Sequence, residues 1–287
     1  MDTLALAGLD SLSLAMLLFL LSAGLSITFG LMRVLNMAHA SFYLLGGYIG
    51  LAVFGRTRNF WISVVAAGLA MALAGCFLYR GFLQRFSKED EMPQVLLTFG
   101  MLLIAGDAAL VTWGGAVLRL PPPTSLSGPI ALGSVVYPRY RFFVIVAGLL
   151  MAVVLSVLVN RTRLGAVVRA GVDDTETAQT IGVNMPRVFL LVFALGSLIA
   201  GLAGALGAPY LGIYPGLDFD ALLLAFAVVI VGGAGSVEGA FVAAIVVALL
   251  DTLTKTYVPA LSYFSIYVPM ALILAFRPQG LLGRTAA

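Results

Sequence analysis

The chain alternates apolar runs with short polar connectors. Nine apolar runs cover residues 11–31, 42–54, 60–79, 94–113, 141–159, 188–206, 219–231, 240–256 and 262–276. A helix needs about 20 apolar residues to cross a hydrocarbon core of about 30 Å, and most runs approach that length, although 42–54 and 219–231 are shorter. The pattern predicts an all-α polytopic membrane protein with about eight to nine transmembrane helices, forming a single transmembrane domain over residues 1–287.

The composition supports a membrane protein. Hydrophobic residues make up 61% of the 287 residues and charged residues only 10%, whereas soluble domains contain about 25% charged residues. Spanning strands would give alternating segments of about ten residues, which the chain lacks, and helices satisfy the backbone within lipid. We expect the outer faces to contact membrane lipid. The net charge of +3 gives no sign of nucleic-acid binding.

Residues 160–187 form the one strongly charged connector with helical features. Asp173, Asp174 or Thr175 can cap a helix and place acid in its first turn, and Gly182 is a suitable end. The pattern indicates a short amphipathic helix outside the membrane, although polarity alone fits a solvated loop between two helices equally well. Four arginines place the segment on the cytoplasmic side by the positive-inside rule: Arg161, Arg163, Arg169 and Arg187.

The distribution of Lys and Arg predicts the orientation of the chain. With residues 160–187 inside and nine crossings, the N-terminus lies outside and the C-terminus inside. Ten cations then lie inside and six outside, which favours this orientation. Trp61 and Trp113 fall at outer ends, where indole rings prefer the membrane interface.

Small residues recur along one face of the run at 188–206. Gly196, Ala200 and Gly204 are four residues apart, so the helix can approach its neighbours closely. We interpret this face as a helix-packing surface in preference to a ligand site.

The sequence argues against bond-making chemistry. His39 and Cys76 are the only histidine and cysteine, which excludes a His/Cys metal cluster. Ser236 lies outside a G-x-S-x-G pattern, and neither Lys88 nor Lys255 completes a P-loop. We expect no enzyme activity and no cofactor on this chain, and any ATP and Mg²⁺ must be bound by a partner.

Polar groups inside the apolar runs are the candidates for a translocation path or gate. Arg33, Asn36 and His39 are three residues apart and would share one face of a helix, or a broken helix would direct free backbone groups into a cavity. Asp107 lies in the fourth run. Each of these groups is equally open to a structural interpretation, His39 as a packed core histidine and Asp107 as a carboxyl paired to a neighbouring helix.

Four motifs resemble one known family. They are Gly30–His39 followed by Phe42–Tyr48; Arg163–Gly165 with Arg169, Ile181–Val183 and Arg187; Val231–Ala240; and Arg277–Gly283. In this order they are similar to LivH-type permeases, the membrane subunits of branched-chain amino acid ABC importers. Met37, Ala40 and Glu238 depart from the usual residues, and the family includes carriers of amides, urea and aromatic acids, so the exact solute stays open.

The resemblance implies partners and residue roles. A second, LivM-like permease, two cytoplasmic ABC ATPases and a periplasmic solute-binding protein are expected, in a bacterial inner membrane. The ATPase-coupling residues implied are Asp173, Asp174, Glu176, Thr177, Ala178, Gly182 and Val183, and the structural elbow implied is Gly232, Gly233, Gly235, Ser236 and Gly239. The competing hypothesis is an ion-coupled secondary transporter or channel that uses Asp107 and His39 without ATPases.

Overall fold

The apolar runs form helices throughout the chain. The computed structural model describes residues 2–32, 35–86, 91–132, 135–277 and 279–282. In chain order its elements are α1 (Asp2–Met32), α2 (His39–Thr57), α3 (Phe60–Leu78), the π-helical turn η1 (Tyr79–Leu83), α4 (Gln84–Phe86), α5 (Glu91–Trp113), the 3-10 turn η2 (Thr124–Leu126), β1 (Pro129–Leu132), β2 (Val135–Pro138), α6 (Arg139–Arg161), α7 (Arg163–Asp173), α8 (Thr175–Thr180), α9 (Met185–Leu211), α10 (Leu217–Gly232), α11 (Val237–Tyr257), the 3-10 turn η3 (Pro259–Phe264) and α12 (Tyr267–Phe276).

Six helical stretches in the described residues are long and apolar enough to span a membrane: α1, α3 continued through α4, α5, α6, α9 and α11. The all-helical membrane fold is therefore confirmed, and the expected count of eight to nine transmembrane helices stays a prediction, since six described stretches satisfy this criterion of length and composition. The runs at 42–54, 219–231 and 262–276 form the helices α2, α10 and α12. These three helices do not satisfy the criterion of length and composition for a membrane span. The last run is shortened because Pro259 opens a 3-10 turn, which leaves ten residues for α12.

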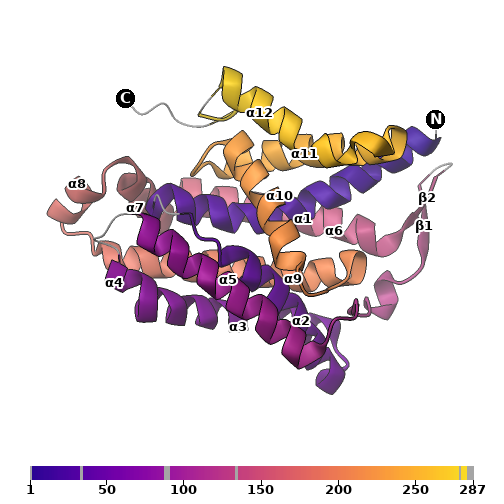
Figure 1. The fold of residues 1–287 in the computed structure, drawn as a ribbon, viewed down its shortest axis with the longest axis horizontal. Helices are drawn as coiled ribbons and strands as arrows, with labels where there is room; N and C mark the ends of the chain where they lie inside the picture. The colour runs from indigo at the N-terminus through magenta and orange to yellow at the C-terminus, as the bar shows by residue number, and fades with distance from the viewer. Residues whose placement is uncertain (1, 33–34, 87–90, 133–134, 278, 283–287) are drawn as a thin grey trace.

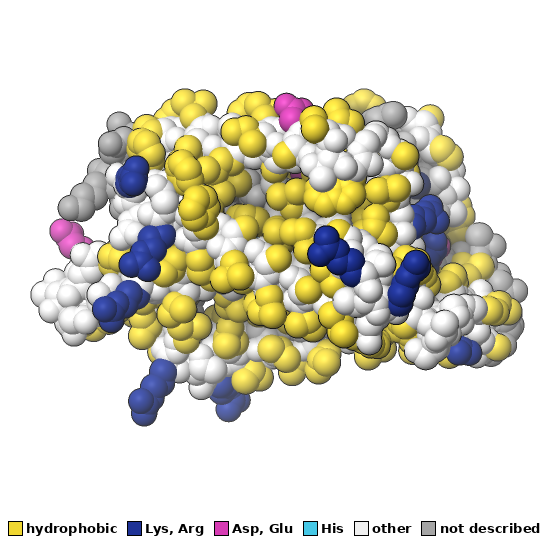
Figure 2. Space-filling view, turned by 90° about the horizontal axis from the view of Figure 1, so that it is seen from below, with side chains coloured by type: hydrophobic (Ala, Val, Ile, Leu, Met, Phe, Trp, Pro, Cys, Tyr) yellow, Lys and Arg dark blue, Asp and Glu magenta, His cyan; other side chains and the backbone are white. Residues whose placement is uncertain are grey.

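Helices α1 and α9 form the centre of the bundle. Helix α1 packs against α6, α9, α10 and α11, and α9 also packs against α2 and α3. Within the most apolar stretch of each helix, 83% of the residues are buried in α1 but only 17% in α5 and 22% in α6. The peripheral helices therefore expose apolar side chains, and Figure 2 shows such side chains over much of one face, as expected for a surface that lipid or a partner covers.

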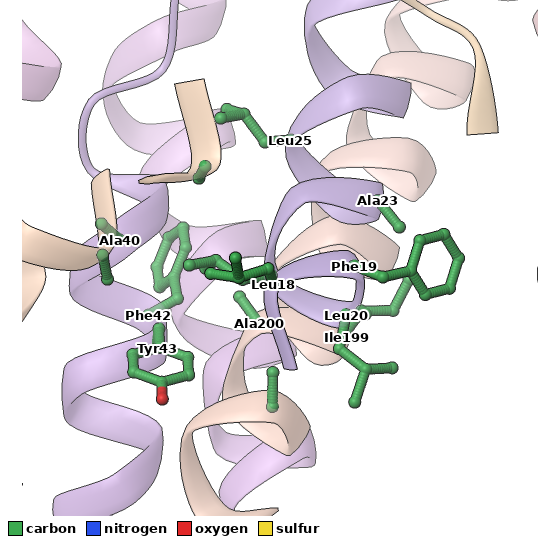
Figure 3. Packing of buried hydrophobic residues seen from close by; sticks show 14 of the residues in the cluster. Leu18, Phe19, Leu20, Ala23, Leu25, Ala40, Phe42, Tyr43, Ile199 and Ala200 are labelled. Carbon is green, nitrogen blue, oxygen red and sulfur yellow. The ribbon is translucent and has the colours of Figure 1, made fainter. Parts of the chain in front are cut away.

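The core is filled where α1, α2 and α9 meet (Figure 3). Leu18 of α1 lies beside Phe42 of α2, with Ala200 of α9 close by. Phe42 also contacts Phe193 of α9 edge to face, with the ring centroids 6.1 Å apart. Large apolar side chains thus fill the space between helices wherever glycine does not bring the backbones together.

Glycines of α9 allow three neighbours to approach its backbone. A Cβ at Gly196 would lie 3.0 Å from the carbonyl oxygen of Gly24 in α1, one at Gly201 would lie 2.7 Å from a side chain of α3, and one at Gly204 would overlap the carbonyl oxygen of Tyr43 in α2. The close packing predicted from the small-residue face is confirmed.

Two segments lie at opposite ends of the bundle (Figure 1). Helices α7 and α8 project at one end, and the antiparallel β1–β2 hairpin lies at the other, beside the start of α1. Arg141, just after the hairpin, forms an ion pair of 2.6 Å with Asp10. The connector between α5 and α6 is not a continuous helix, as its three consecutive prolines predict, but the hairpin within it was not expected.

Candidate functional sites

Helix α8 lies in the charged connector of residues 160–187, where a short amphipathic helix was predicted, and Asp174 caps it. The Oδ1 atom of Asp174 accepts hydrogen bonds from the backbone N–H groups of Glu176, at 2.9 Å, and Thr177, at 3.0 Å. The Thr177 hydroxyl donates to Oδ2 at 2.5 Å. These bonds, the Thr177 hydroxyl foremost, hold the pKa of Asp174 below its ordinary value. Asp174 therefore carries a full negative charge that fixes the start of α8.

The end of α8 is also fixed, by a left-handed turn at Gly182, whose φ is 92°. The N–H of Gly182 donates to the carbonyl of Gln179 at 2.9 Å, and that of Val183 to the carbonyl of Ala178 at 3.1 Å. Such paired bonds satisfy the last carbonyls of a helix. Gly182 thus ends the helix as the sequence predicts.

The residues of α8 divide into an anchored face and an exposed face. Ala178 is buried and Val183 half-buried, so both hold the helix against the protein. The exposed residues are Asp174, Glu176, Thr177, Gln179, Thr180, Ile181 and Gly182; Asp173 ends α7, and its side chain lies outside the described residues. Ile181 is 73% exposed; it belongs to the Ile181–Val183 motif but was not among the coupling residues that the resemblance implied.

Helix α7, which was not expected as a separate element, connects α8 to the bundle. Thr162 caps it by accepting from the N–H of Gly165 at 3.1 Å, and the Arg169 guanidinium donates to the carbonyl of Val159 in α6. Helix α7 also packs against α1 and α9. Helix α8 is therefore connected to the central helices through α7 and also contacts α9 directly.

The glycine elbow between α10 and α11 supports the same end of α1. Gly233 and Gly235 have positive φ angles of 96° and 80°, and a Cβ at Gly30 would overlap Gly235. Ser236 caps α11 by accepting from the N–H of Gly239 at 2.9 Å.

The elbow also binds the segment that follows α12. The N–H of Leu281 donates to the carbonyl of Val231 at 2.7 Å, and that of Leu282 to the carbonyl of Gly232 at 3.1 Å. The predicted elbow residues therefore lie where α1, α10, α11 and the C-terminal segment meet, in a packing role.

Asn36 lies in the connector between α1 and α2, and His39 is the first residue of α2, so these two residues do not share one face of a single helix as considered from the sequence. Arg33 lies outside the described residues. Asn36 is buried, and within the described part of the chain neither of its side-chain polar atoms has a hydrogen-bond partner. His39 is buried and its Nε2 donates to the carbonyl of Leu21 at 3.0 Å, which defines the Nε2–H tautomer, while Nδ1 has no partner. The ring also lies against Gly24 of α1, so His39 joins α2 to α1.

Asp107 is not brought together with His39. It is exposed on α5 and lines a small cavity between α5 and α10, opposite Asp218. Asp218 was not predicted as a site residue, because in the sequence it ends a segment that contains proline and tyrosine, and only packing buries it. In the part of the chain that the structure describes, no three His, Cys, Asp or Glu side chains are grouped to hold a metal ion.

Comparison with known proteins identifies the family. Residues 8–276 match the family described as branched-chain amino acid transport system / permease component. The chain is 24% identical over 282 residues to the high-affinity branched-chain amino acid transport system permease protein LivH of Escherichia coli K12, covering 92% of this chain and 91% of that protein.

Two further relatives give the same result. The identity is 25% over 283 residues to the permease protein BraD of Pseudomonas aeruginosa PAO1, with the same coverage, and 28% over 300 residues to the permease protein LivM of E. coli K12, covering 96% of this chain and 70% of that protein. The comparison with solved structures gives no match. The chain therefore belongs to the family of branched-chain amino acid transport system permease components.

Proposed function

We propose that this chain is a membrane subunit of an ATP-driven importer for branched-chain amino acids or closely related small carboxylates and amides. It pairs with a second, homologous permease, receives solute from a periplasmic binding protein, and is driven by two cytoplasmic ABC ATPases that bind ATP and Mg²⁺. The names of the relatives support this solute class, and the match to both LivH and LivM supports a pair of homologous permeases.

The anchored and exposed helix α8 is the observation that carries this proposal. It is capped at both ends, joined to the central helices through α7 and α9, and exposes charged and apolar side chains outside the candidate spans. A partner that binds this helix differently in two nucleotide states would bias the bundle between inward-open and outward-open arrangements. No covalent chemistry on this chain is needed.

The positions of the ends support one orientation in a bacterial inner membrane. The start of α1 lies at the hairpin end of the bundle and α8 lies at the other (Figure 1). With α8 in the cytoplasm, the N-terminus is periplasmic, and the hairpin faces the binding protein. The C-terminus is cytoplasmic, because the segment after α12 binds the elbow beside the end of α1.

Reconstitution of the importer into liposomes tests the proposal. We expect leucine to accumulate only when both permeases, the ATPases, the binding protein and ATP are present. Accumulation by the permeases alone, driven by an ion gradient, would support the second candidate function, a secondary transporter. The carboxylate of Asp107 beside a cavity is the observation that favours that alternative.

The substitution Glu176→Lys tests the role of α8. Glu176 is exposed in the first turn of α8, so reversing its charge should leave insertion and folding unchanged but weaken the ATPase contact. Because like charges across an interface are repelled, we expect ATP-driven uptake to fall about tenfold, which corresponds to about 1.4 kcal/mol of lost contact free energy. Uptake is measured beside ATP hydrolysis, with Glu176→Gln as the neutral control. Unchanged uptake in Glu176→Lys would contradict the assignment.

A further inference from the structure

A cavity of about 170 Å³ lies between α5 and α10, away from α8. Leu102, Leu110 and Phe219 supply part of its apolar wall, and Asp107 and Asp218 are its two charged lining residues. The lining contains no Lys, Arg or His among the residues that the structure describes. The cavity therefore combines apolar surface with negative charge only.

Asp218 is the unusual member of this lining. This residue is 1% exposed, and neither carboxylate oxygen has a hydrogen-bond partner among the described residues. A Cβ at Gly106 would lie 3.3 Å from Oδ2, so the glycine of α5 lets the carboxylate reach the cavity. A buried carboxylate without a partner is destabilising, and it indicates that a partner binds here in the working protein.

The start of α10 stabilises the charge of Asp218 but does not pair it. Asp218 lies in the first turn of this helix of 16 residues, where the helix dipole favours a negative group. The N–H groups of Phe219 and Asp220, however, donate to the carbonyl of Gly216, at 3.0 and 3.3 Å. The oxygens of Asp218 therefore stay available to a donor from the cavity.

Helix α2 brings a second unpaired polar group to this region. The hydroxyl of Tyr48 is buried without a partner, and its ring stacks on Trp113 of α5 at 4.7 Å. Helix α2 packs against both α5 and α10. The stacking on Trp113 fixes the position of the Tyr48 ring. The Tyr48 hydroxyl is therefore a positioned polar group for a solute that enters between these helices.

We propose that the cavity of Asp107 and Asp218 binds the ammonium group of the transported solute. An ammonium group has three donors and a positive charge, which suit two carboxylates, and the apolar wall suits an aliphatic side chain. Urea, neutral amides and aromatic acids without an amine carry no such cation. This inference rests on the proposed function and narrows the solute to compounds with an amino group.

The substitution Asp218→Asn removes the charge with little change in shape. In liposomes that contain the whole importer, we expect leucine uptake to fall at least tenfold. The matched control is Asp220→Asn, because Asp220 is exposed two residues later, outside the lining, and accepts from Tyr214 at 2.9 Å. We expect less than a twofold change in the control. Wild-type uptake in Asp218→Asn would overturn the inference, whereas a wild-type importer that carries no leucine would contradict the proposed function instead.

A binding measurement separates solute recognition from a contact with the second permease. Radiolabelled leucine is bound to the complex of permeases and ATPases without the binding protein, and isoamylamine or 4-methylpentanoate is added as competitor. These compounds have similar branched alkyl groups but opposite charges. We expect isoamylamine to compete in the wild type and at least tenfold less well in Asp218→Asn. Competition by 4-methylpentanoate alone, or by neither compound, would show that Asp218 does not bind the ammonium group.

Discussion

Replacing Ile181 by aspartate is expected to lower ATP-driven uptake by tenfold or more without unfolding the protein. Ile181 directly follows α8, and 73% of its surface is exposed, so the folded chain gains little from its apolar side chain. In the complete importer, the same side chain would be desolvated against an ATPase. Truncation of a buried interface anchor costs about 2 kcal/mol or more, and a buried carboxylate without a partner costs further free energy.

The effect of Ile181→Asp is measured as leucine uptake and as recovery of the ATPases with the purified permeases. Ile181→Val, which keeps an apolar contact, should retain most of the uptake. Thr180→Asp places the same charge on the neighbouring exposed residue and should have a clearly smaller effect. Equal loss in Thr180→Asp and Ile181→Asp would show that charge at this end of α8, and not the apolar contact of Ile181, determines the result.

Gly204→Ala should cause the largest loss of stability among single-methyl substitutions in α9. The new Cβ would overlap the carbonyl oxygen of Tyr43, a backbone atom that a side-chain rotation cannot move. Overpacking of this kind costs about 1–3 kcal/mol, and we expect a value near the upper end because α2 and α9 must separate. The free energy of unfolding is measured by denaturant titration in detergent micelles.

Gly100→Ala is the matched control for this substitution. Gly100 also lies within a membrane helix, α5, but a Cβ there meets nothing within 4 Å. Since alanine has the higher helix propensity, Gly100→Ala should leave stability unchanged or slightly higher. Equal stability of the Gly204→Ala and Gly100→Ala variants would contradict the close contact between the backbones of α2 and α9.

Features set by local sequence could be predicted. Apolar runs predicted the helices, and the four-residue spacing of Gly196, Ala200 and Gly204 predicted the close packing of α9. Asp174 and Gly182 predicted the two ends of α8. Each of these depends on residues within a few positions of one another. The helices α2, α10 and α12 show what an apolar run alone cannot predict. Such a run predicts a helix, but it does not predict whether that helix crosses the membrane.

Features set by tertiary packing could not be predicted. In the sequence, Asp218 resembles an acidic residue of a solvent-exposed loop. It is buried beside a cavity only because α5 packs closely against it at Gly106. Ile181 looks like one more apolar residue of a helix, and only the folded chain shows that it is exposed. Asp107 and His39, which the sequence grouped as possible coupling residues, lie apart because His39 packs onto α1.

Photo-crosslinking tests most directly whether ATPases act on this chain through α8. A photoreactive amino acid is placed at Gln179, exposed on α8, or at Val136, which is 65% exposed on the hairpin at the opposite end, and the assembled importer is irradiated. We expect position 179 to crosslink to an ATPase subunit and position 136 not to do so. Crosslinking of position 179 to the periplasmic binding protein, or of position 136 to the ATPase, would contradict the proposed role of α8.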